Sequence, residues 1–198
     1  MTYVAIEGID GAGKSTVADA AVAELLARGV DAVGVREPGG TRAGEAIRQV
    51  VLLDEDNGLG PWAEAMLFAA ARSQLAAEVI GPALDAGRTV IGDRSVYSSL
   101  AYQGGGRGLG IERVRTVNEA GLGGVWPERV VLLKLDPAAG LAREDLADRI
   151  SAEGLAFQED VAAAYDRLAE AEPDRFVIVE AARPLDEVVA ATVEAALA

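Results

Sequence analysis

The sequence contains no cysteine and no histidine, and these two absences remove much of the usual catalytic repertoire. Without cysteine there is no disulfide, no zinc finger and no thiol nucleophile. Without histidine there is no Ser-His-Asp triad, no imidazole acid–base catalysis and no histidine metal ligand. Any chemistry must therefore use carboxylates, Lys, Arg, hydroxyls, backbone amides or a hard metal ion.

Long apolar runs and excess positive charge are missing as well. No segment reaches the roughly 18 consecutive apolar residues of a membrane span, and the first residues lack the basic and apolar regions of a secretory signal. We therefore expect a cytoplasmic protein with no membrane partner. The 32 acidic residues outnumber the 18 basic ones, which gives a net charge of −14. So acidic a chain is a poor candidate for binding nucleic acid, although a local site can still bind a small phosphate compound.

Apolar strands alternate with helical patterns along the 198 residues. Strands are expected at residues 3–7, 32–36, 89–92, 130–135 and 176–179. Helices are expected at 14–28, 44–53, 62–84, 96–102, 111–120, 138–150, 156–171 and 185–197, and loops at 54–60 and 104–110. Continuous apolar strands indicate burial on both faces, so the pattern predicts a three-layer α/β fold in one domain, residues 1–198. The charged stretch 143–154 favours a flap over a core helix.

The segment Gly8-Ile9-Asp10-Gly11-Ala12-Gly13-Lys14-Ser15 matches the phosphate-binding pattern G-x-x-x-x-G-K-[ST], between a strand and a helix. Its glycines allow backbone N–H groups to point at phosphate oxygens, Lys14 reaches the β/γ-phosphates, and the Ser15 hydroxyl is a Mg²⁺ ligand. The alternative is a chance match in a Gly- and Ala-rich sequence. Only two of the 18 basic residues are lysines, however, and one stands in this loop. The sequence therefore predicts a nucleoside triphosphate site.

Further segments follow in a fixed order: Arg36-Glu37-Pro38-Gly39-Gly40-Thr41, Gly92-Asp93-Arg94, Ala101-Tyr102-Gln103-Gly104-Gly105-Gly106-Arg107-Gly108 and Asp148-Arg149-Ile150. Together with the phosphate-binding loop this set resembles the bacterial thymidylate kinases, which make dTDP from dTMP and ATP. The resemblance implies a P-loop fold with a five-stranded parallel sheet in the order 2-3-1-4-5 and a small lid at about residues 142–154. It also implies Mg²⁺ as cofactor and a homodimer.

The resemblance places ATP on the loop, at Gly8, Asp10, Gly11, Ala12, Gly13, Lys14, Ser15 and Thr16. Asp93 joins Ser15 at Mg²⁺, and Arg94 faces the acceptor phosphate; the alternative is a surface ion pair at a strand end. The loop carries no arginine, which implies that Arg149 in the lid completes the catalytic set of Lys14, Arg94 and Arg149. Arg143 is implied to stack on adenine. The alternative for both lid arginines is an amphipathic helix with ordinary ion pairs.

For dTMP the resemblance implies that Phe68 stacks on thymine and that Arg72 donates to a base carbonyl; the two are spaced i, i+4 on one helix face. Tyr102 is implied to lie under the sugar and to leave no room for a 2′-hydroxyl. The other expected contacts are Ser99 and Gln103 near the base, Arg36 and Glu37 bordering the monophosphate site, and Asp10 at Mg²⁺ or a sugar hydroxyl.

Several alternatives remain open from the sequence. Phe68 alone fits core packing, and Gly104–Gly106 fit a plain flexible turn. Ser95 and Ser151 depart from the family pattern, which puts the phosphate-side geometry and lid closure in question. The rival functions are another nucleoside monophosphate or deoxynucleoside kinase and a nucleotide-binding switch module.

Overall fold

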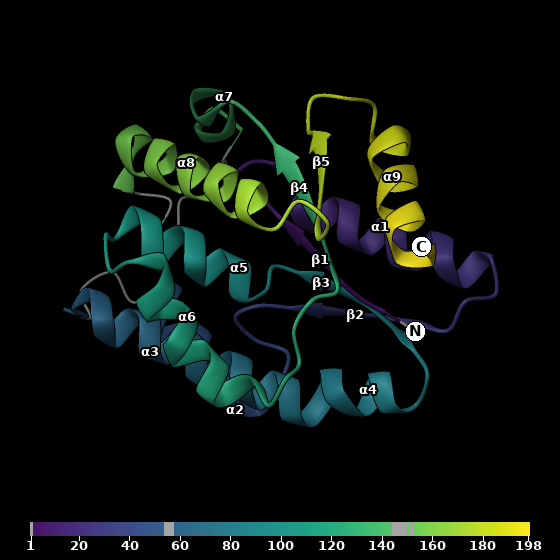
Figure 1. Ribbon diagram of the computed structural model, residues 1–198, viewed down its shortest axis with the longest axis horizontal. Helices are drawn as coiled ribbons and strands as arrows, with labels where there is room; N and C mark the ends of the chain where they lie inside the picture. The colour runs from purple at the N-terminus through teal and green to yellow at the C-terminus, as the bar shows by residue number, and fades with distance from the viewer. Residues whose placement is uncertain (1, 54–57, 144–149, 151–152) are drawn as a thin grey trace.

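Five strands form one parallel sheet in the part of the chain that the computed structural model describes, residues 2–53, 58–143, 150 and 153–198. The strands are β1 (Tyr3–Glu7), β2 (Ala32–Arg36), β3 (Thr89–Asp93), β4 (Arg129–Lys134) and β5 (Phe176–Glu180). Their order is β2-β3-β1-β4-β5, and every neighbouring pair is parallel. The predicted sheet and strand order are confirmed, and β1 lies in the middle (Figure 1).

Helices connect the strands. They are α1 (Lys14–Ala27), α2 (Arg42–Arg48), α3 (Pro61–Leu75), α4 (Gly81–Asp85), α5 (Val96–Ser99), α6 (Ile111–Leu122), α7 (Pro137–Leu141), α8 (Leu155–Ala171) and α9 (Leu185–Leu197), with π-helical segments η1 (Gln49–Leu53), η2 (Ala76–Ile80) and η3 (Leu100–Gly106). The single helix expected at 62–84 is therefore α3, η2 and α4 in succession. Pro82 has no N–H for the α-helical ladder, and the winding changes just before it.

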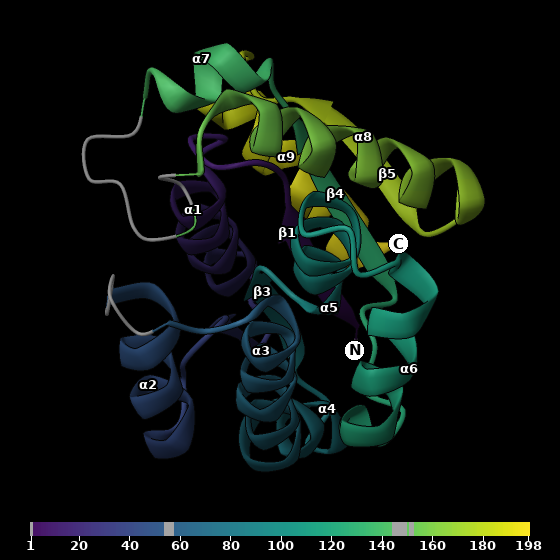
Figure 2. The same cartoon turned by 90° about the vertical axis from the view of Figure 1, so that its left-hand side faces the viewer.

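Alternation along β1 divides the core between the two faces of the sheet. Tyr3 packs in a cluster with Leu75 of α3, whereas Ile6 belongs to the larger cluster that includes Leu25 of α1. Because successive strand side chains point to opposite faces, helices must cover both faces. Figure 2 shows α1 on one side of β1 and β3, and α3 and α4 on the other.

The carboxyl ends of β1, β2 and β3 lie next to one another and carry charged residues. Glu7 ends β1, while Arg36 at the end of β2 is paired in register with Asp93 at the end of β3. The phosphate-binding loop leaves this edge after β1 and runs into α1. Ligands of open α/β sheets bind at this edge, so it is the place to look for a site.

The prediction of a loop at 104–110 is wrong for its first three residues, because Gly104–Gly106 belong to the π-helical segment η3. A Cβ on Gly105 would lie 2.4 Å from the Cβ of Ala164, and one on Gly106 would lie 2.6 Å from the ring of Phe157. These glycines therefore allow α8 to approach η3 closely, which a sequence pattern read as flexible does not reveal.

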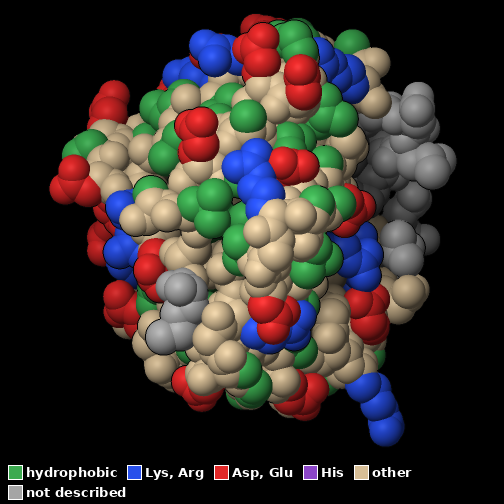
Figure 3. Space-filling model, turned by 90° about the vertical axis from the view of Figure 1, so that its right-hand side faces the viewer, with side chains coloured by type: hydrophobic (Ala, Val, Ile, Leu, Met, Phe, Trp, Pro, Cys, Tyr) green, Lys and Arg blue, Asp and Glu red, His purple; other side chains and the backbone are tan. Residues whose placement is uncertain are grey.

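The helix expected at 138–150 is described only over α7, which ends at Leu141. Residues 144–149 and 151–152, including most of the expected lid at 142–154, lie outside the described residues. Within the described chain no helix has the length and apolar character needed to cross a membrane. Acidic and basic side chains are interspersed with hydrophobic ones over the face shown in Figure 3, so the negative charge forms no patch of one sign there.

Candidate nucleotide-binding site

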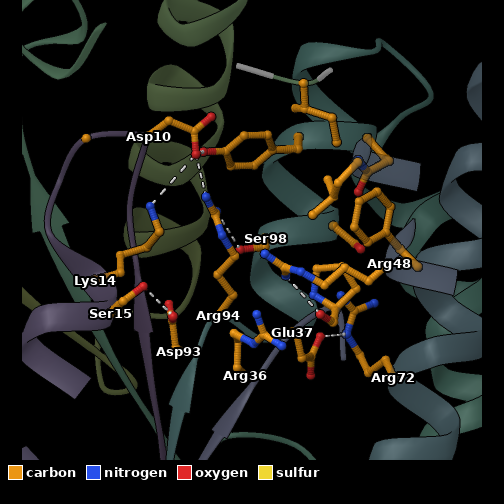
Figure 4. A pocket seen from close by; sticks show the side chains of 18 of the residues that line it. Asp10, Lys14, Ser15, Arg36, Glu37, Arg48, Arg72, Asp93, Arg94 and Ser98 are labelled. Atoms are coloured by element: carbon orange, nitrogen blue, oxygen red, sulfur yellow. Dashed lines mark hydrogen bonds and ion pairs between the residues drawn. The ribbon is translucent and has the colours of Figure 1, made fainter. Parts of the chain in front are cut away.

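A cavity of about 430 Å³ opens at the carboxyl edge of β1, β2 and β3. Its volume lies within the usual range of small-molecule sites. Figure 4 shows the charged side chains that point into it. The lining residues are Asp10, Gly11, Gly13, Lys14, Ser15, Thr16, Arg36, Glu37, Pro38, Arg48, Leu52, Phe68, Arg72, Asp93, Arg94, Ser98, Ser99, Tyr102, Gln103 and Ile150. Most of the residues expected at the site thus lie around one cavity.

Glycines curl the phosphate-binding loop through left-handed backbone conformations. Gly11 has a φ of +75°, and Gly13, which caps α1, has a φ of +85°. A Cβ on Gly11 would lie 2.1 Å from the carbonyl oxygen of Gly140 in α7. Position 11 therefore requires glycine both for its backbone conformation and for its close approach to α7.

Lys14 is the first residue of α1 and is almost fully buried. Its Nζ donates to the carbonyl oxygen of Ile9 at 2.7 Å and lies 3.9 Å from Oδ1 of Asp10. Burial and the nearby guanidinium of Arg94 lower the pKa of Lys14 to about 8, although Asp10 acts in the opposite direction. Arriving phosphate charge would favour the protonated amine.

Asp10 is a buried carboxylate held from several directions. Arg94 Nη2 and the Tyr102 hydroxyl donate to its Oδ1, the latter at 2.9 Å, and Gln158 Nε2 donates to its Oδ2 at 2.8 Å. Burial raises the pKa of Asp10, but Arg94 and Lys14, aided by the Gln158 and Tyr102 hydrogen bonds, outweigh burial and lower it to about 2. Asp10 is therefore ionised at neutral pH and anchors the Arg94 guanidinium.

Arg94 has a φ of +72° and is the one non-glycine residue of the described chain with a positive φ. Left-handed backbone of this kind is strained and tends to occur at functional positions. The guanidinium lies 5.1 Å from the centroid of the Tyr102 ring, and its Nη1 donates to Ser98 Oγ at 3.4 Å. Backbone and side chain together direct a cation into the cavity (Figure 4).

The Ser15–Asp93 pair fits a hard cation such as Mg²⁺. Ser15 Oγ donates to Oδ2 of Asp93 at 2.6 Å, so two oxygen ligands meet beside the phosphate-binding loop. Among the described residues no cluster of three or more His, Cys, Asp or Glu side chains could enclose a metal. Mg²⁺ in nucleotide enzymes is usually held by one or two carboxylates with phosphates and waters, and the pair would fit the protein share of such a site.

At the other end of the cavity Arg72 is buried in a fixed orientation. Its Nε donates to Glu37 Oε2 at 2.6 Å, its Nη1 donates to Asn118, and its Nη2 donates to the Ser95 carbonyl oxygen at 3.2 Å. Burial raises the pKa of Glu37 to about 7, although the ion pair with Arg72 acts in the opposite direction. Phe68 lies one turn earlier on α3, so an apolar ring and a directed cation line this end.

Side chains of α5 and η3 line the cavity between these two ends. The Tyr102 ring packs edge-on against Phe157, with ring centroids 6.1 Å apart. Gln103 donates from Nε2 to Oε1 of Glu64 at 3.0 Å. Ser99 Oγ is the one buried side-chain polar atom of the described residues that lacks a hydrogen-bond partner. Because a buried hydroxyl without a partner costs free energy, Ser99 is a candidate ligand contact.

Four expected site residues are not among those that line the cavity. Gly8 and Ala12 belong to the curled loop but do not line the cavity. Arg143 is exposed after α7 and is not part of the lining either. Arg149 lies outside the described residues.

The sequence patterns missed several residues that the fold brings to the site. Arg48 lines the cavity, and its Nη1 donates to the carbonyl oxygen of Pro38 at 3.0 Å. Gln158 reaches Asp10 from α8 across 148 positions of sequence. Glu7 is fully buried directly before the loop. A carboxylate at the end of an apolar strand is a signal that would have found Glu7, and a polar residue spaced i, i+3 and i, i+7 with the buried Val161 and Tyr165 of α8 is a signal that would have found Gln158.

A phosphate-binding loop beside the central strand of a parallel sheet, with one cavity joining it to a second set of cations, defines a P-loop nucleotide kinase. The family model described as thymidylate kinase matches residues 6–192. The chain belongs to the thymidylate kinase family.

Similar curated proteins cover nearly the whole chain. It is 43% identical to a thymidylate kinase of Lactobacillus delbrueckii subsp. bulgaricus, with 97% of this chain and 93% of the relative covered. It is 48% identical to one of Desulforudis audaxviator, with 91% and 83% covered. It is 45% identical to one of Bifidobacterium longum, with 96% and 94% covered.

Proposed function

We propose that this protein transfers the γ-phosphoryl group of ATP to the phosphate of dTMP, giving dTDP and ADP. The observation that carries the proposal is one cavity with Lys14 and Arg94 at one end and Phe68 and Arg72 at the other, in a chain of the thymidylate kinase family. A base held at the Phe68–Arg72 end directs its 5′-phosphate toward Arg94. That phosphate then faces the γ-phosphate held at Lys14.

The donor end binds the ATP phosphates through the backbone N–H groups of the loop and the ammonium of Lys14. Ser15 and Asp93 would hold Mg²⁺, which would supply positive charge to the ATP phosphates. Phosphoryl transfer needs positioned positive charge more than acid–base chemistry. The pKa of Asp10 is lowered to about 2, so its carboxylate stays ionised at neutral pH. The charged carboxylate keeps the Arg94 guanidinium oriented toward the donor end of the cavity.

The acceptor end binds dTMP. Arg94 contacts its phosphate, with Arg36 and Glu37 at the border of the monophosphate site, and Tyr102 lies under the deoxyribose and leaves no room for a 2′-hydroxyl. The thymine stacks on Phe68, and Arg72, Ser99 and Gln103 make its polar contacts. Support comes from the shared cavity and from the Ser99 hydroxyl, whose missing partner a ligand can supply.

The remaining assignments follow from the family. We propose Arg149, in a lid at about 142–154 of the single domain 1–198, as the cation that reaches the transferred phosphoryl group, and Arg143 as the residue that stacks on adenine. The Arg149→Ala variant is then expected to lower kcat on the order of 10³-fold, whereas Arg143→Ala chiefly weakens ATP binding. We further propose a homodimer in the cytoplasm, where ATP and dTMP are available.

A panel of acceptors tests the function. With ATP and Mg²⁺, kcat/KM is expected to be highest for dTMP, lower for dUMP, and far lower for dGMP and for the ribose form of TMP. A preference for another monophosphate would assign the chain to a different acceptor. Slow ATP hydrolysis that no monophosphate accelerates would indicate a nucleotide-binding switch instead.

A further inference from the structure

We propose that Glu64 is a specificity-determining positioning residue, which fixes the Gln103 carboxamide so that its carbonyl oxygen, and not its amino group, faces the base. The inference rests on the proposed function, in which Gln103 lies beside the pyrimidine. It assigns a role to a buried carboxylate that the phosphoryl-transfer chemistry does not use.

Glu64, on α3, is 1% exposed and makes a two-point contact with Arg107. Arg107, directly after η3, donates from Nε to Oε1 and from Nη2 to Oε2, both at 3.2 Å. The Arg107 guanidinium is itself held over the ring of Phe157, 4.9 Å from its centroid. Both Glu64 oxygens therefore accept hydrogen bonds from the guanidinium, and the carboxylate presents acceptors to its neighbours, not a donor.

Because Glu64 offers only acceptors, it determines which end of the Gln103 carboxamide faces it. Gln103 is 2% exposed, and its Nε2 donates to Oε1 of Glu64 at 3.0 Å. The reversed carboxamide would place two acceptor oxygens against each other in a buried position, which is costly. The nitrogen end is therefore committed to Glu64, and the oxygen end remains for the cavity that Gln103 lines.

The geometry selects one class of pyrimidine. Thymine and uracil offer a donor at N3 and an acceptor oxygen at position 4, whereas cytosine offers an acceptor at N3 and an amino group at position 4. The Gln103 oxygen and the Arg72 N–H groups complement the first pattern and oppose the second. Arg72 has no acceptor to present, but an unrestrained carboxamide can turn over and accommodate either pattern. Glu64 prevents that turn.

The decisive measurement is the ratio of kcat/KM for dTMP to kcat/KM for dCMP. Glu64→Gln keeps the size of the side chain but can donate as well as accept, so the Gln103 carboxamide becomes free to turn over. We expect the ratio to fall at least about tenfold, mainly because dCMP becomes a better substrate. A purely structural role would lower both kcat/KM values alike, and an unchanged ratio overturns the inference.

Two further variants serve as controls for a loss of folding stability. Arg107→Lys keeps a cation beside Glu64 and is expected to leave the ratio unchanged; an equal fall in the ratio overturns the inference. The double variant E64Q/R107Q removes both charges of the Glu64–Arg107 pair, and it is expected to show the same fall as Glu64→Gln even if the single variant is unstable.

Gln103→Leu separates failure of this inference from failure of the proposed function. The variant removes the carboxamide, so kcat/KM for dTMP is expected to fall. If it does not fall, Gln103 does not contact the base, and the proposed placement of thymine is wrong together with the inference. If it falls while Glu64→Gln leaves the ratio unchanged, only the role of Glu64 is wrong.

Discussion

Lys14, Glu37 and Asp10 are all deeply buried around the cavity, but their pKa values shift differently because their charges and their neighbours differ. Burial lowers the pKa of Lys14 to about 8 and raises that of Glu37 to about 7, while cations around Asp10 outweigh burial and lower its pKa to about 2. The role of each of these groups can therefore be tested by a single substitution that removes its charge.

The two lysines of the chain provide a matched pair of substitutions. Lys14→Ala should leave the fold intact and reduce kcat at least about 10²-fold, because it removes the point charge on the transferring phosphate. Lys134→Ala is the control, since Lys134 is 47% exposed and pairs with Asp166 at 2.8 Å, away from the cavity. Steady-state kinetics with circular dichroism compare them, and near-normal turnover of Lys14→Ala would contradict the loop assignment.

Glu37 gives the stability of the protein a pH dependence of definite sign. An ordinary Glu in the unfolded chain has a pKa of about 4.3, and the folded value is about 7. Between these values the folded state keeps a proton that the unfolded state releases. The contribution of Glu37 to the free energy of unfolding therefore falls as pH rises through this window, and the loss is complete above the folded pKa.

Glu37→Gln removes this titration. The free energy of unfolding of the variant minus that of the wild type should increase by up to about 1.4 kcal/mol per pH unit between about pH 4.5 and 7, and should then level off. Urea unfolding at several pH values measures the difference. A difference that stays constant with pH would show that Glu37 titrates normally.

Ser95 shows how a residue that departs from a pattern can still serve the site. Its hydroxyl caps α5 by accepting from the Tyr97 N–H at 3.2 Å, and it donates to the buried Glu7 at 2.7 Å. Ser95 directly follows Arg94, so this cap helps to fix the backbone that carries the Arg94 guanidinium. The other departure, Ser151, lies outside the described residues.

At the scale of elements, the strands were predictable almost to the residue, because short apolar runs ended by charged or glycine residues leave little choice of period. The winding of the helices was not. The local sequence does not distinguish the end of η3 from a loop at Gly104–Gly106. These glycines make room for α8, which lies about 50 positions further along the chain. Close packing between distant elements is invisible to a local pattern.

The contact between α7 and the phosphate-binding loop is an element-scale feature that can be tested. A Cβ on Gly140 would lie 2.5 Å from the carbonyl oxygen of Asp10, so Gly140→Ala must displace the loop or α7. Overpacking of this kind costs about 1–3 kcal/mol. We expect a lower Tm and a higher KM for ATP.

Gly34→Ala is the matched control for this prediction. Gly34 lies on β2 and is exposed, and a Cβ there would meet only a Val22 methyl at 3.4 Å. Its Tm and its KM for ATP should match those of the wild type. Gly140→Ala variants that bind ATP normally would show that α7 yields without disturbing the loop.

On the scale of the whole molecule, the sequence located the loop and the ends of the strands but not the network that joins them. The position of Lys14 followed from the loop motif, and those of Phe68 and Arg72 followed from the resemblance to the family. Gln158 and Asn118 did not, because each reaches the site through contacts between distant parts of the chain that only the assembled fold creates. Arg48, whose partner Pro38 is ten positions away, was not predicted either.

Binding should be visible as stabilisation of the whole domain. A ligand at about 100 times its Kd adds about 2.7 kcal/mol to the free energy of unfolding, which for a domain of this size raises the Tm by about 5–10 °C. We expect such a rise with dTMP and little change with dCMP at the same concentration, measured by calorimetry. Equal rises would contradict the proposed recognition of the base.

The strained backbone of Arg94 has a consequence for how this protein can change under selection. Left-handed backbone costs a side-chain-bearing residue about 1–2 kcal/mol that glycine does not incur. Glycine at position 94 would remove this cost, but it would also leave the buried Asp10 carboxylate without the guanidinium that holds it, which costs more. Laboratory evolution of more heat-resistant variants should therefore retain arginine at position 94, because the ion pair with Asp10 outweighs the strain of the backbone.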